Sequence, residues 1–225
     1  MVIFKVTNWS FGQFLKIRRT MGITKQELSL PGNSKGKLAF VLYDVFTEEE
    51  CKKYIEDSER RGYELALVNI GGGRQMEATD VRNNARNIWD SREEAANILQ
   101  RIQDYLPKEW KGRKLVELNE RLRFLRYNPG EYFKPHFDGS YMRTNGDVSY
   151  ITVQIYLNEG FKGGSTTFLN KFDSKDGGLE VVPKTGSVLI FQHDILHEGS
   201  ILEEGRKYAI RTDVMYTKNA STNNC

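Results

Sequence analysis

Three histidines are the residues of this chain best suited to bind a metal: His136, His193 and His197. His136 lies two residues before Asp138 in the segment YFKPHFD. Residues i and i+2 of a β-strand project from the same face, so one imidazole and one carboxylate would point together. His197, just after the run GSVLIFQ, is placed to add a third ligand. Two histidines and a carboxylate with open positions opposite are typical of non-haem Fe(II), although zinc binds the same residue types.

The same residues have ordinary alternatives. An H-x-D triplet occurs often by chance, and either residue could be a surface group or a hydrogen-bonded polar group of the core. His193 also competes with His197 as the third ligand. The flanking residues therefore have to decide whether a metal site exists.

A second group of polar residues follows the period of a β-strand near the end of the chain. Lys207, Ala209, Arg211 and Asp213 would share one face of a strand, and so would Tyr150, Thr152, Gln154 and Tyr156 on another. An inward-facing lysine or arginine is costly unless a fixed anion meets it. These positions therefore predict an anion-binding pocket if they face inward, and solvated side chains if they face outward. The outward reading suits Arg206, which alternates away from Lys207.

Helices and then strands are expected to hold these residues. A β-prone run covers 38–46, and capping boxes at Thr47/Glu50 and Ser91/Glu94 predict helices over 47–61 and 91–106. From about residue 120, short β-prone runs alternate with turn residues, which favours an antiparallel sandwich or barrel. We predict an α+β, mainly β fold with an N-terminal arm or edge strand (1–36), one domain (37–218, β-core 120–216) and a C-terminal tail (219–225).

Composition limits the class of protein. The 225 residues are 39% hydrophobic and 28% charged, with a net charge of +3, which is too slight to argue for a nucleic-acid partner. We see no secretory signal and no apolar run long enough for a membrane span, so we expect no membrane partner and a cytoplasmic location. Two cysteines, Cys51 and Cys225, are too few for a disulfide framework or a cysteine-based zinc site.

Four ordered motifs resemble one known family, the Fe(II)- and 2-oxoglutarate-dependent dioxygenases of the prolyl 4-hydroxylase type. They are Y-N-P-G-E-Y-F-K-P-H-F-D (127–138), I-Y-L-N…G-G-S-T-T-F (155–168), G-S-V-L-I-F…H-E-G (186–199) and R-K-Y-A-I-R-T-D-V-M-Y (206–216). The resemblance implies a double-stranded β-helix, or jelly roll, with supporting helices. It also implies that Fe(II) is bound by His136, Asp138 and His197.

The resemblance further implies a 2-oxoglutarate pocket. Lys207 would pair with the far carboxylate, ahead of Arg211 and then Arg206, and Tyr156, Tyr127 and Thr166 would line the pocket. The segment 80–89 resembles a loop that covers the substrate, which makes Arg82, Asn83 and Asn84 candidate substrate-binding residues unless the loop is simply solvated. The segment 139–149 is a second candidate lid.

The resemblance implies hydroxylation of a substrate C–H group, with a prolyl residue of a peptide or protein as the leading candidate. Fe(II), 2-oxoglutarate, O₂ and ascorbate would take part, and succinate and CO₂ would be released. Another amino-acid side chain, a small molecule, a zinc-binding cupin-like protein and a non-catalytic binding module remain alternatives. The sequence does not indicate an oligomeric state.

Overall fold

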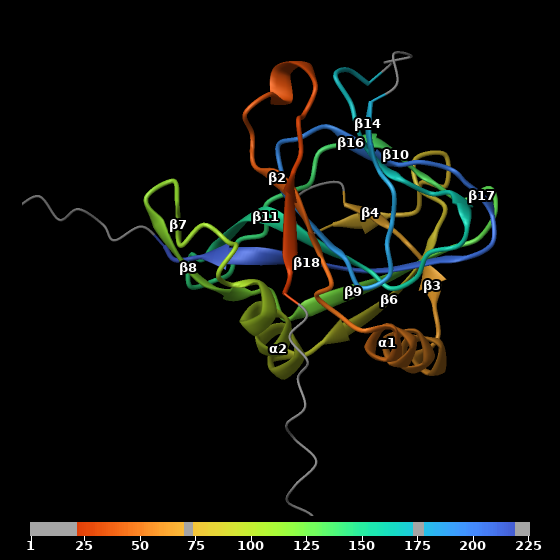
Figure 1. Ribbon diagram of the computed structural model, residues 1–225, viewed down its shortest axis with the longest axis horizontal. Coiled ribbons are helices and arrows are strands. Elements are labelled where there is room, and N and C mark those ends of the chain that lie inside the picture. Colours follow the sequence, from red (N-terminus) through yellow and green to blue (C-terminus); the bar gives the residue numbers. More distant parts are fainter. Residues whose placement is uncertain (1–21, 70–73, 173–177, 219–225) are drawn as a thin grey trace, which may run out of the picture.

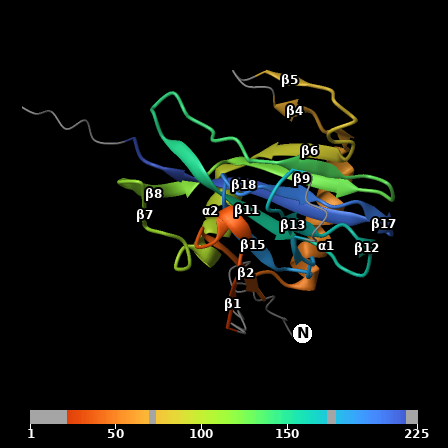
Figure 2. The same cartoon turned by 90° about the horizontal axis from the view of Figure 1, so that it is seen from above.

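A computed structural model of the chain describes residues 22–69, 74–172 and 178–218. Its main antiparallel sheet follows the order β1-β2-β15-β11-β18-β9-β6-β3 (Figures 1 and 2). These strands are β1 (Thr24–Glu27), β2 (Ala39–Tyr43), β15 (Val188–Gln192), β11 (Val148–Tyr156), β18 (Lys207–Tyr216), β9 (Arg121–Tyr127), β6 (Ala85–Asp90) and β3 (Glu64–Leu65). Strand β8 (Arg113–Leu118) pairs with β18 and with β7 (Glu109–Trp110).

A smaller antiparallel sheet carries the candidate metal ligands. Its order is β10-β16-β13-β14, with β10 (Phe133–His136), β16 (His197–Gly199), β13 (Thr166–Phe168) and β14 (Leu179–Val181). Two short ribbons complete the described strands: β12 (Lys162–Gly163) with β17 (Leu202–Glu204), and β4 (Val68–Asn69) with β5 (Gln75–Met76). A 3-10 turn, η1, covers Gly32–Ser34.

The main sheet is apolar on both faces. Successive side chains of its central strands point to opposite faces, and both sets are apolar. Phe40, Leu42 and Ile190 pack into the cluster that includes both helices. Their neighbours Val41, Leu189 and Phe191 pack instead with Phe168 and Val181 of the small sheet. The two faces thus support a helical layer on one side and the small sheet on the other.

The two helices lie together at one side of the main sheet (Figure 1). Helix α1 (Glu48–Arg61) begins with the Thr47/Glu50 capping box, and α2 (Arg92–Ile102) begins at Ser91, whose hydroxyl accepts from the Glu94 N–H. Arg101 of α2 donates to both carboxylate oxygens of Glu50, at 2.8 and 2.6 Å. This pair joins the helices, and α2 ends four residues before the predicted limit at residue 106.

Gly186 is required where the chain enters β15. Its φ is +76°, and an added Cβ would lie 2.0 Å from the Phe46 carbonyl oxygen. The Phe46 N–H donates to the Gly186 carbonyl at 3.1 Å, so the two backbones touch directly. A residue without a side chain is needed at this contact.

Only part of the predicted arm and tail can be compared with the structure. Within 1–36, the described residues form edge strand β1, which pairs with β2, and the turn η1. Residues 1–21 and the predicted tail at 219–225 lie outside the described ranges. The division into arm, domain and tail therefore stays a prediction.

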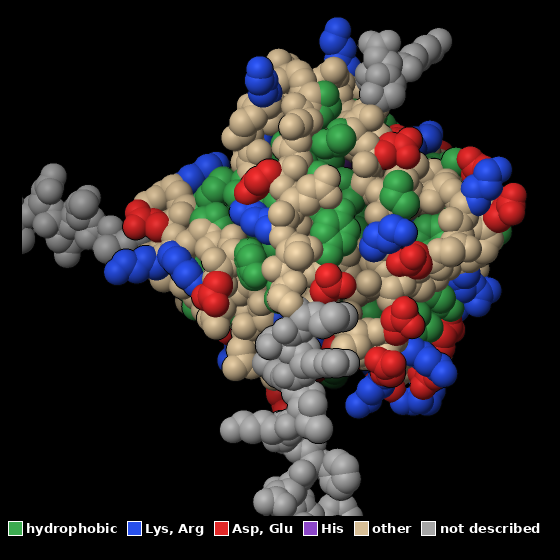
Figure 3. All heavy atoms as spheres, in the orientation of Figure 1, with side chains coloured by type: hydrophobic (Ala, Val, Ile, Leu, Met, Phe, Trp, Pro, Cys, Tyr) green, Lys and Arg blue, Asp and Glu red, His purple; other side chains and the backbone are tan. Residues whose placement is uncertain are grey.

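The molecular surface carries charges of both signs. On the face in Figure 3, Lys and Arg side chains are interspersed with Asp and Glu rather than gathered into one patch. Neither described helix is long and apolar enough to cross a membrane.

Candidate metal centre and its cavity

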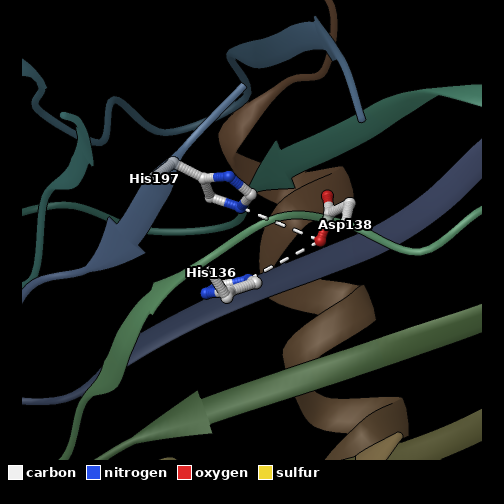
Figure 4. Close-up of side chains that lie close together, drawn as sticks. All are labelled: His136, Asp138 and His197. Atoms are coloured by element: carbon white, nitrogen blue, oxygen red, sulfur yellow. Dashed lines mark ion pairs between the residues drawn. The ribbon is translucent and has the colours of Figure 1, made fainter. Parts of the chain in front are cut away.

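His136, Asp138 and His197 converge on one point, as Figure 4 shows. Asp138 Oδ1 lies 3.6 Å from His136 Nε2 and 3.8 Å from His197 Nε2. The three candidate ligand atoms all lie within 4.8 Å of one another. In the described part of the chain, no other group of three His, Cys, Asp or Glu side chains could hold a metal ion.

Strand pairing in the small sheet explains this convergence. His136 is the last residue of β10 and lies directly opposite His197, the first residue of β16. Asp138 lies beyond the end of β10, so the prediction that it shares a strand with His136 is wrong. Its position is held by its own N–H, which donates to the His193 carbonyl at 3.1 Å. A backbone bond outside the strand thus turns the carboxylate toward both imidazoles.

Hydrogen bonds orient each candidate ligand. The backbone carbonyls of Lys134 and Ile195 lie 2.8 Å from His136 Nδ1 and 2.9 Å from His197 Nδ1. A protonated Nδ1 in each ring would donate to its carbonyl and leave Nε2 with a free lone pair facing the centre. The Thr152 hydroxyl donates to Asp138 Oδ2 at 2.5 Å, so Oδ1 faces the imidazoles.

The protonation states suit a metal cation. Burial alone would raise the pKa of Asp138, but Arg211, His197 and His136 hold it well below its usual value. Burial lowers the pKa of His197 to about 4, against the opposing effect of Asp138. Asp138 is therefore ionised and His197 neutral at pH 7, which are the forms that bind metals.

Arg211 lines the cavity but pairs with two carboxylates of the protein. Its guanidinium is 3.0 Å from Asp138 Oδ1 and 3.5 Å from Asp213 Oδ1. Asp213 is also paired with Arg123 at 3.2 Å and lies 3.5 Å from His193 Nε2. His193, the competing third ligand, thus faces Asp213, and the structure groups His197 with the other two candidates.

A cavity opens beside His136 and His197, and Lys207 lines it. Lys207 is 2% exposed, and its ammonium donates to the Gly164 carbonyl at 2.5 Å. Burial lowers the pKa of Lys207 to about 7, with no contribution from a neighbouring charge. Arg206, the alternative by a one-residue shift, is exposed and donates to Asn128 at 2.9 Å.

Two tyrosine rings lie near this lysine. Its ammonium is 5.0 Å from the ring centre of Tyr127 and 5.7 Å from that of Tyr156. The Tyr156 hydroxyl donates to Thr166 Oγ1 at 2.8 Å, and Gln154 Nε2 donates to the same oxygen at 2.9 Å. The structure thus brings the predicted Lys207, Tyr156, Tyr127 and Thr166 together. Tyr150, expected on the face of Thr152, packs with the main core beside a register shift in β11.

The three candidate substrate residues differ in position. Arg82 lines the cavity, whereas the side chains of Asn83 and Asn84 form hydrogen bonds within the protein. Asn83 Oδ1 accepts from the Tyr132 N–H at 2.8 Å, and Asn84 Oδ1 accepts from Arg82 Nε at 2.6 Å. Asn84 therefore supports the arginine, whereas Asn83 binds the backbone at Tyr132. In the other candidate lid, Met142 pairs with Val148 by an isolated bridge and is 71% exposed.

Sequence reasoning missed several residues of the site. Thr152 was placed on the right face by its period but was given no role, and Phe133 stacks on His136 with ring centres 3.6 Å apart. Glu198 also lines the cavity. An aromatic three residues before the histidine was visible in the motif, whereas the reach of Thr152 depends on how the sheets pack.

The donor set fits ferrous iron. Two imidazole nitrogens and one carboxylate oxygen are all turned inward on one side, which leaves the other side of an ion open to further ligands. The buried cation of Lys207 fits a dicarboxylic co-substrate, because within the described ranges no acidic side chain pairs with it.

Comparison with known proteins agrees with this fit. Residues 122–212 match the 2OG-Fe(II) oxygenase superfamily. The chain is 27% identical over 199 residues to probable prolyl 4-hydroxylase 10 of Arabidopsis thaliana (76% of this chain, 66% of that protein). It is 28% identical over 204 residues to prolyl 4-hydroxylase 2 of the same plant (76% and 64%). The chain thus spans about two thirds of the length of these relatives.

Solved structures confirm the predicted fold. A viral collagen prolyl hydroxylase from Paramecium Bursaria Chlorella virus-1, in complex with 2OG, has a TM-score of 0.55 at 20% identity (82% of this chain, 99% of that one). A prolyl hydroxylase from Trichoplax adhaerens, in complex with a hypoxia inducible factor peptide, has a TM-score of 0.57 at 14% identity (80% and 84%). The two packed antiparallel sheets are the double-stranded β-helix of such oxygenases. Residues 122–212 therefore match the 2OG-Fe(II) oxygenase superfamily, and the chain is similar to prolyl 4-hydroxylases in sequence and to such oxygenases in fold.

Proposed function

We propose that this protein is an Fe(II)- and 2-oxoglutarate-dependent dioxygenase that hydroxylates a prolyl residue of a peptide or protein and releases succinate and CO₂. One observation carries the proposal: three ligand atoms within 4.8 Å of one another lie beside a cavity lined by a buried lysine that pairs with no acidic side chain among the described residues. The combination matters because a dicarboxylate such as 2-oxoglutarate would use both: the metal at one end and the lysine at the other.

His136, Asp138 and His197 would hold the iron, and their hydrogen bonds prepare them for it. The carbonyls of Lys134 and Ile195 orient the imidazoles, and Thr152 occupies the oxygen of Asp138 that faces away. When bound together, Fe(II), 2-oxoglutarate and O₂ supply the oxidising chemistry that places one oxygen atom in a substrate C–H bond.

Lys207 would bind the far carboxylate of 2-oxoglutarate. A carboxylate in the cavity would compensate the charge that burial disfavours, so binding would restore the protonated form of this lysine. Thr166 and Tyr127 line the same cavity, and the buried Tyr156 hydroxyl donates to Thr166 from behind the cavity wall. These groups would orient the co-substrate toward the metal.

The relatives support a prolyl substrate, since similar plant proteins are named prolyl 4-hydroxylases and one structural neighbour was solved with a peptide. Arg82, with Asn83 and Asn84 behind it, would contact this substrate. Ascorbate would act as the reductant that keeps the iron ferrous. Hydroxylation of another amino-acid side chain, or of a small molecule, would show as succinate release with those substrates and not with prolyl peptides.

A succinate-release assay with Fe(II), ascorbate and proline-containing peptides tests the proposal. We expect His136→Ala to abolish turnover, and Lys207→Met to raise the apparent KM for 2-oxoglutarate at least tenfold. Arg206→Gln is the matched control, because it removes the neighbouring exposed cation and should leave KM unchanged. Unchanged turnover in the first two variants would refute the assignment. Peptide binding without any consumption of 2-oxoglutarate would instead indicate a non-catalytic binding module.

A further inference from the structure

The cavity beside the candidate metal centre is lined by three cationic side chains: Lys207, Arg211 and Arg82. Two of them have a partner or an assigned role. Arg211 faces the carboxylates of Asp138 and Asp213, and Lys207 is assigned above to the far carboxylate of 2-oxoglutarate. Arg82 is the remaining cation of the cavity, and neither these carboxylates nor the proposed 2-oxoglutarate pairs with it.

Arg82 is buried without a carboxylate partner in the part of the chain that the structure describes. It is 9% exposed, and its Nε donates to Asn84 Oδ1 at 2.6 Å. Its guanidinium lies 4.5 Å from the ring centre of Phe133 and also interacts with the Tyr127 hydroxyl. All three contacts are with neutral groups that orient the guanidinium; the Asp138 carboxylate attracts it without forming an ion pair and is itself paired with Arg211.

The position of this charge is close to the chemistry. The Phe133 ring that Arg82 contacts is itself stacked on the candidate ligand His136, with 3.6 Å between ring centres. Strand pairing supports the arrangement, because Arg82 and Phe133 form an isolated antiparallel bridge. Burial lowers the pKa of Arg82 to about 10, so the side chain is charged at neutral pH.

Glu198 is the acidic side chain that could compensate Arg82 from the cavity wall. Its Oε1 accepts a hydrogen bond from the Ser200 hydroxyl at 2.9 Å, and no ion pair joins it to Arg82 among the described residues. The cavity therefore offers a fixed, desolvated guanidinium of the kind that binds carboxylates through two parallel hydrogen bonds.

We propose that Arg82 forms an anion subsite for the primary substrate, which presents a carboxylate close to the C–H group that is hydroxylated. This inference rests on the proposed function and narrows its substrate class. The carboxylate belongs either to an Asp or Glu side chain beside the target residue or to a free α-carboxylate at a peptide end. In both cases the negative charge of the substrate compensates the guanidinium charge, which burial has deprived of hydration.

Two matched pairs of peptides test the subsite. In one pair, an internal proline is followed by Glu or by Gln, and in the other, a C-terminal proline is a free acid or an amide. Isothermal titration with metal-free protein measures binding without any turnover. We expect wild type to bind the acid at least tenfold more tightly than the neutral member of one pair, and the pair that shows the difference identifies the source of the carboxylate.

Variants then assign the preference to Arg82. Arg82→Gln should reduce it to less than twofold, Arg82→Lys should retain part of it, and neither should change the apparent KM for 2-oxoglutarate. Arg74→Gln is the control, since Arg74 is an exposed arginine earlier in the chain and does not line the cavity. The preference of wild type alone is a test even if Arg82→Gln does not fold.

Three outcomes would overturn the inference. They are equal or unmeasurable binding of both members of each pair by wild type, an unchanged preference in Arg82→Gln, and a raised KM for 2-oxoglutarate in that variant, which would assign Arg82 to the co-substrate. The failure of the proposed function looks different: an acid preference that depends on Arg82, in a protein that never releases succinate, would keep the subsite and remove the oxygenase activity.

Discussion

The buried ammonium of Lys207 should make the metal-free protein less stable than it would be with an apolar side chain. The residue is 2% exposed, and burial lowers its pKa from 10.5 to about 7. One pKa unit corresponds to about 1.4 kcal/mol, so the shift represents an unfavourable free energy of roughly 5 kcal/mol. Replacing even a buried ion pair by apolar side chains of similar volume can stabilise a protein by about 1–4 kcal/mol, and Lys207 has no carboxylate partner among the described residues.

The pH dependence of this effect has a definite sign. Below pH 7 the lysine is protonated in both folded and unfolded states, so the full cost is present. Between about pH 7 and 10.5 the unfolded state binds more protons than the folded state, so wild-type stability rises with pH by up to about 1.4 kcal/mol per unit from this group. We therefore expect Lys207→Met to be more stable by about 4 kcal/mol at pH 6 and by about a third of that at pH 9.

Urea unfolding followed by far-UV circular dichroism measures this difference. The protein should be free of metal and 2-oxoglutarate, and the wild type, Lys207→Met and Arg206→Gln should be compared at each pH. Because the variants share every other titrating group, the difference between the first two isolates Lys207. A gain that does not shrink as the pH rises, or no gain at all, would show that the cavity does not hold an uncompensated lysine.

Three further perturbations probe the centre and its support. Thr152→Val removes the hydroxyl that donates to Asp138 Oδ2 and should weaken metal binding about 10- to 100-fold, measured by titration with Co(II); unchanged affinity would deny the hydroxyl an orienting role. Arg211→Met leaves the buried Asp138 and Asp213 without their shared cation and should cost about 3–5 kcal/mol in urea unfolding, whereas a loss below about 1 kcal/mol would mean that the carboxylates do not need it. Gly186→Ala should cost more than about 2 kcal/mol in the same assay, because the new Cβ would meet the Phe46 carbonyl at 2.0 Å; wild-type stability would show that this contact relaxes freely.

The sequence was most informative where a local rule decides the structure. The Thr47/Glu50 capping box starts α1, and the period-two pattern places Lys207 and Arg211 on one face of a strand, where both line the cavity; Thr166 is implied by the family resemblance alone. The grouping of His136, Asp138 and His197 was predicted from side-chain chemistry together with the family resemblance, and the structure brings these three residues together.

Contacts between sheets were not predictable in the same way. Arg211 and Asp213 share a strand, but whether the guanidinium reaches Asp138 depends on the separation and twist of two sheets. The end of β10 at His136 was missed because the bond from Asp138 N–H to the His193 carbonyl joins segments that are far apart in sequence. For Asn83 and Asn84, residue type alone could not tell a substrate contact from a bond to the local backbone.

Because His136 pairs directly with His197, an ion bound by both would also stabilise the pairing of β10 with β16. The two residues belong to segments far apart along the chain, and closing the long loop between them costs conformational entropy. An ion held by both imidazoles would lock that closure, since a ligand that binds only the closed form adds its binding free energy to it. Amide hydrogens of β10 and β16 would then exchange more slowly once metal is added, so loading the cofactor would also complete the architecture.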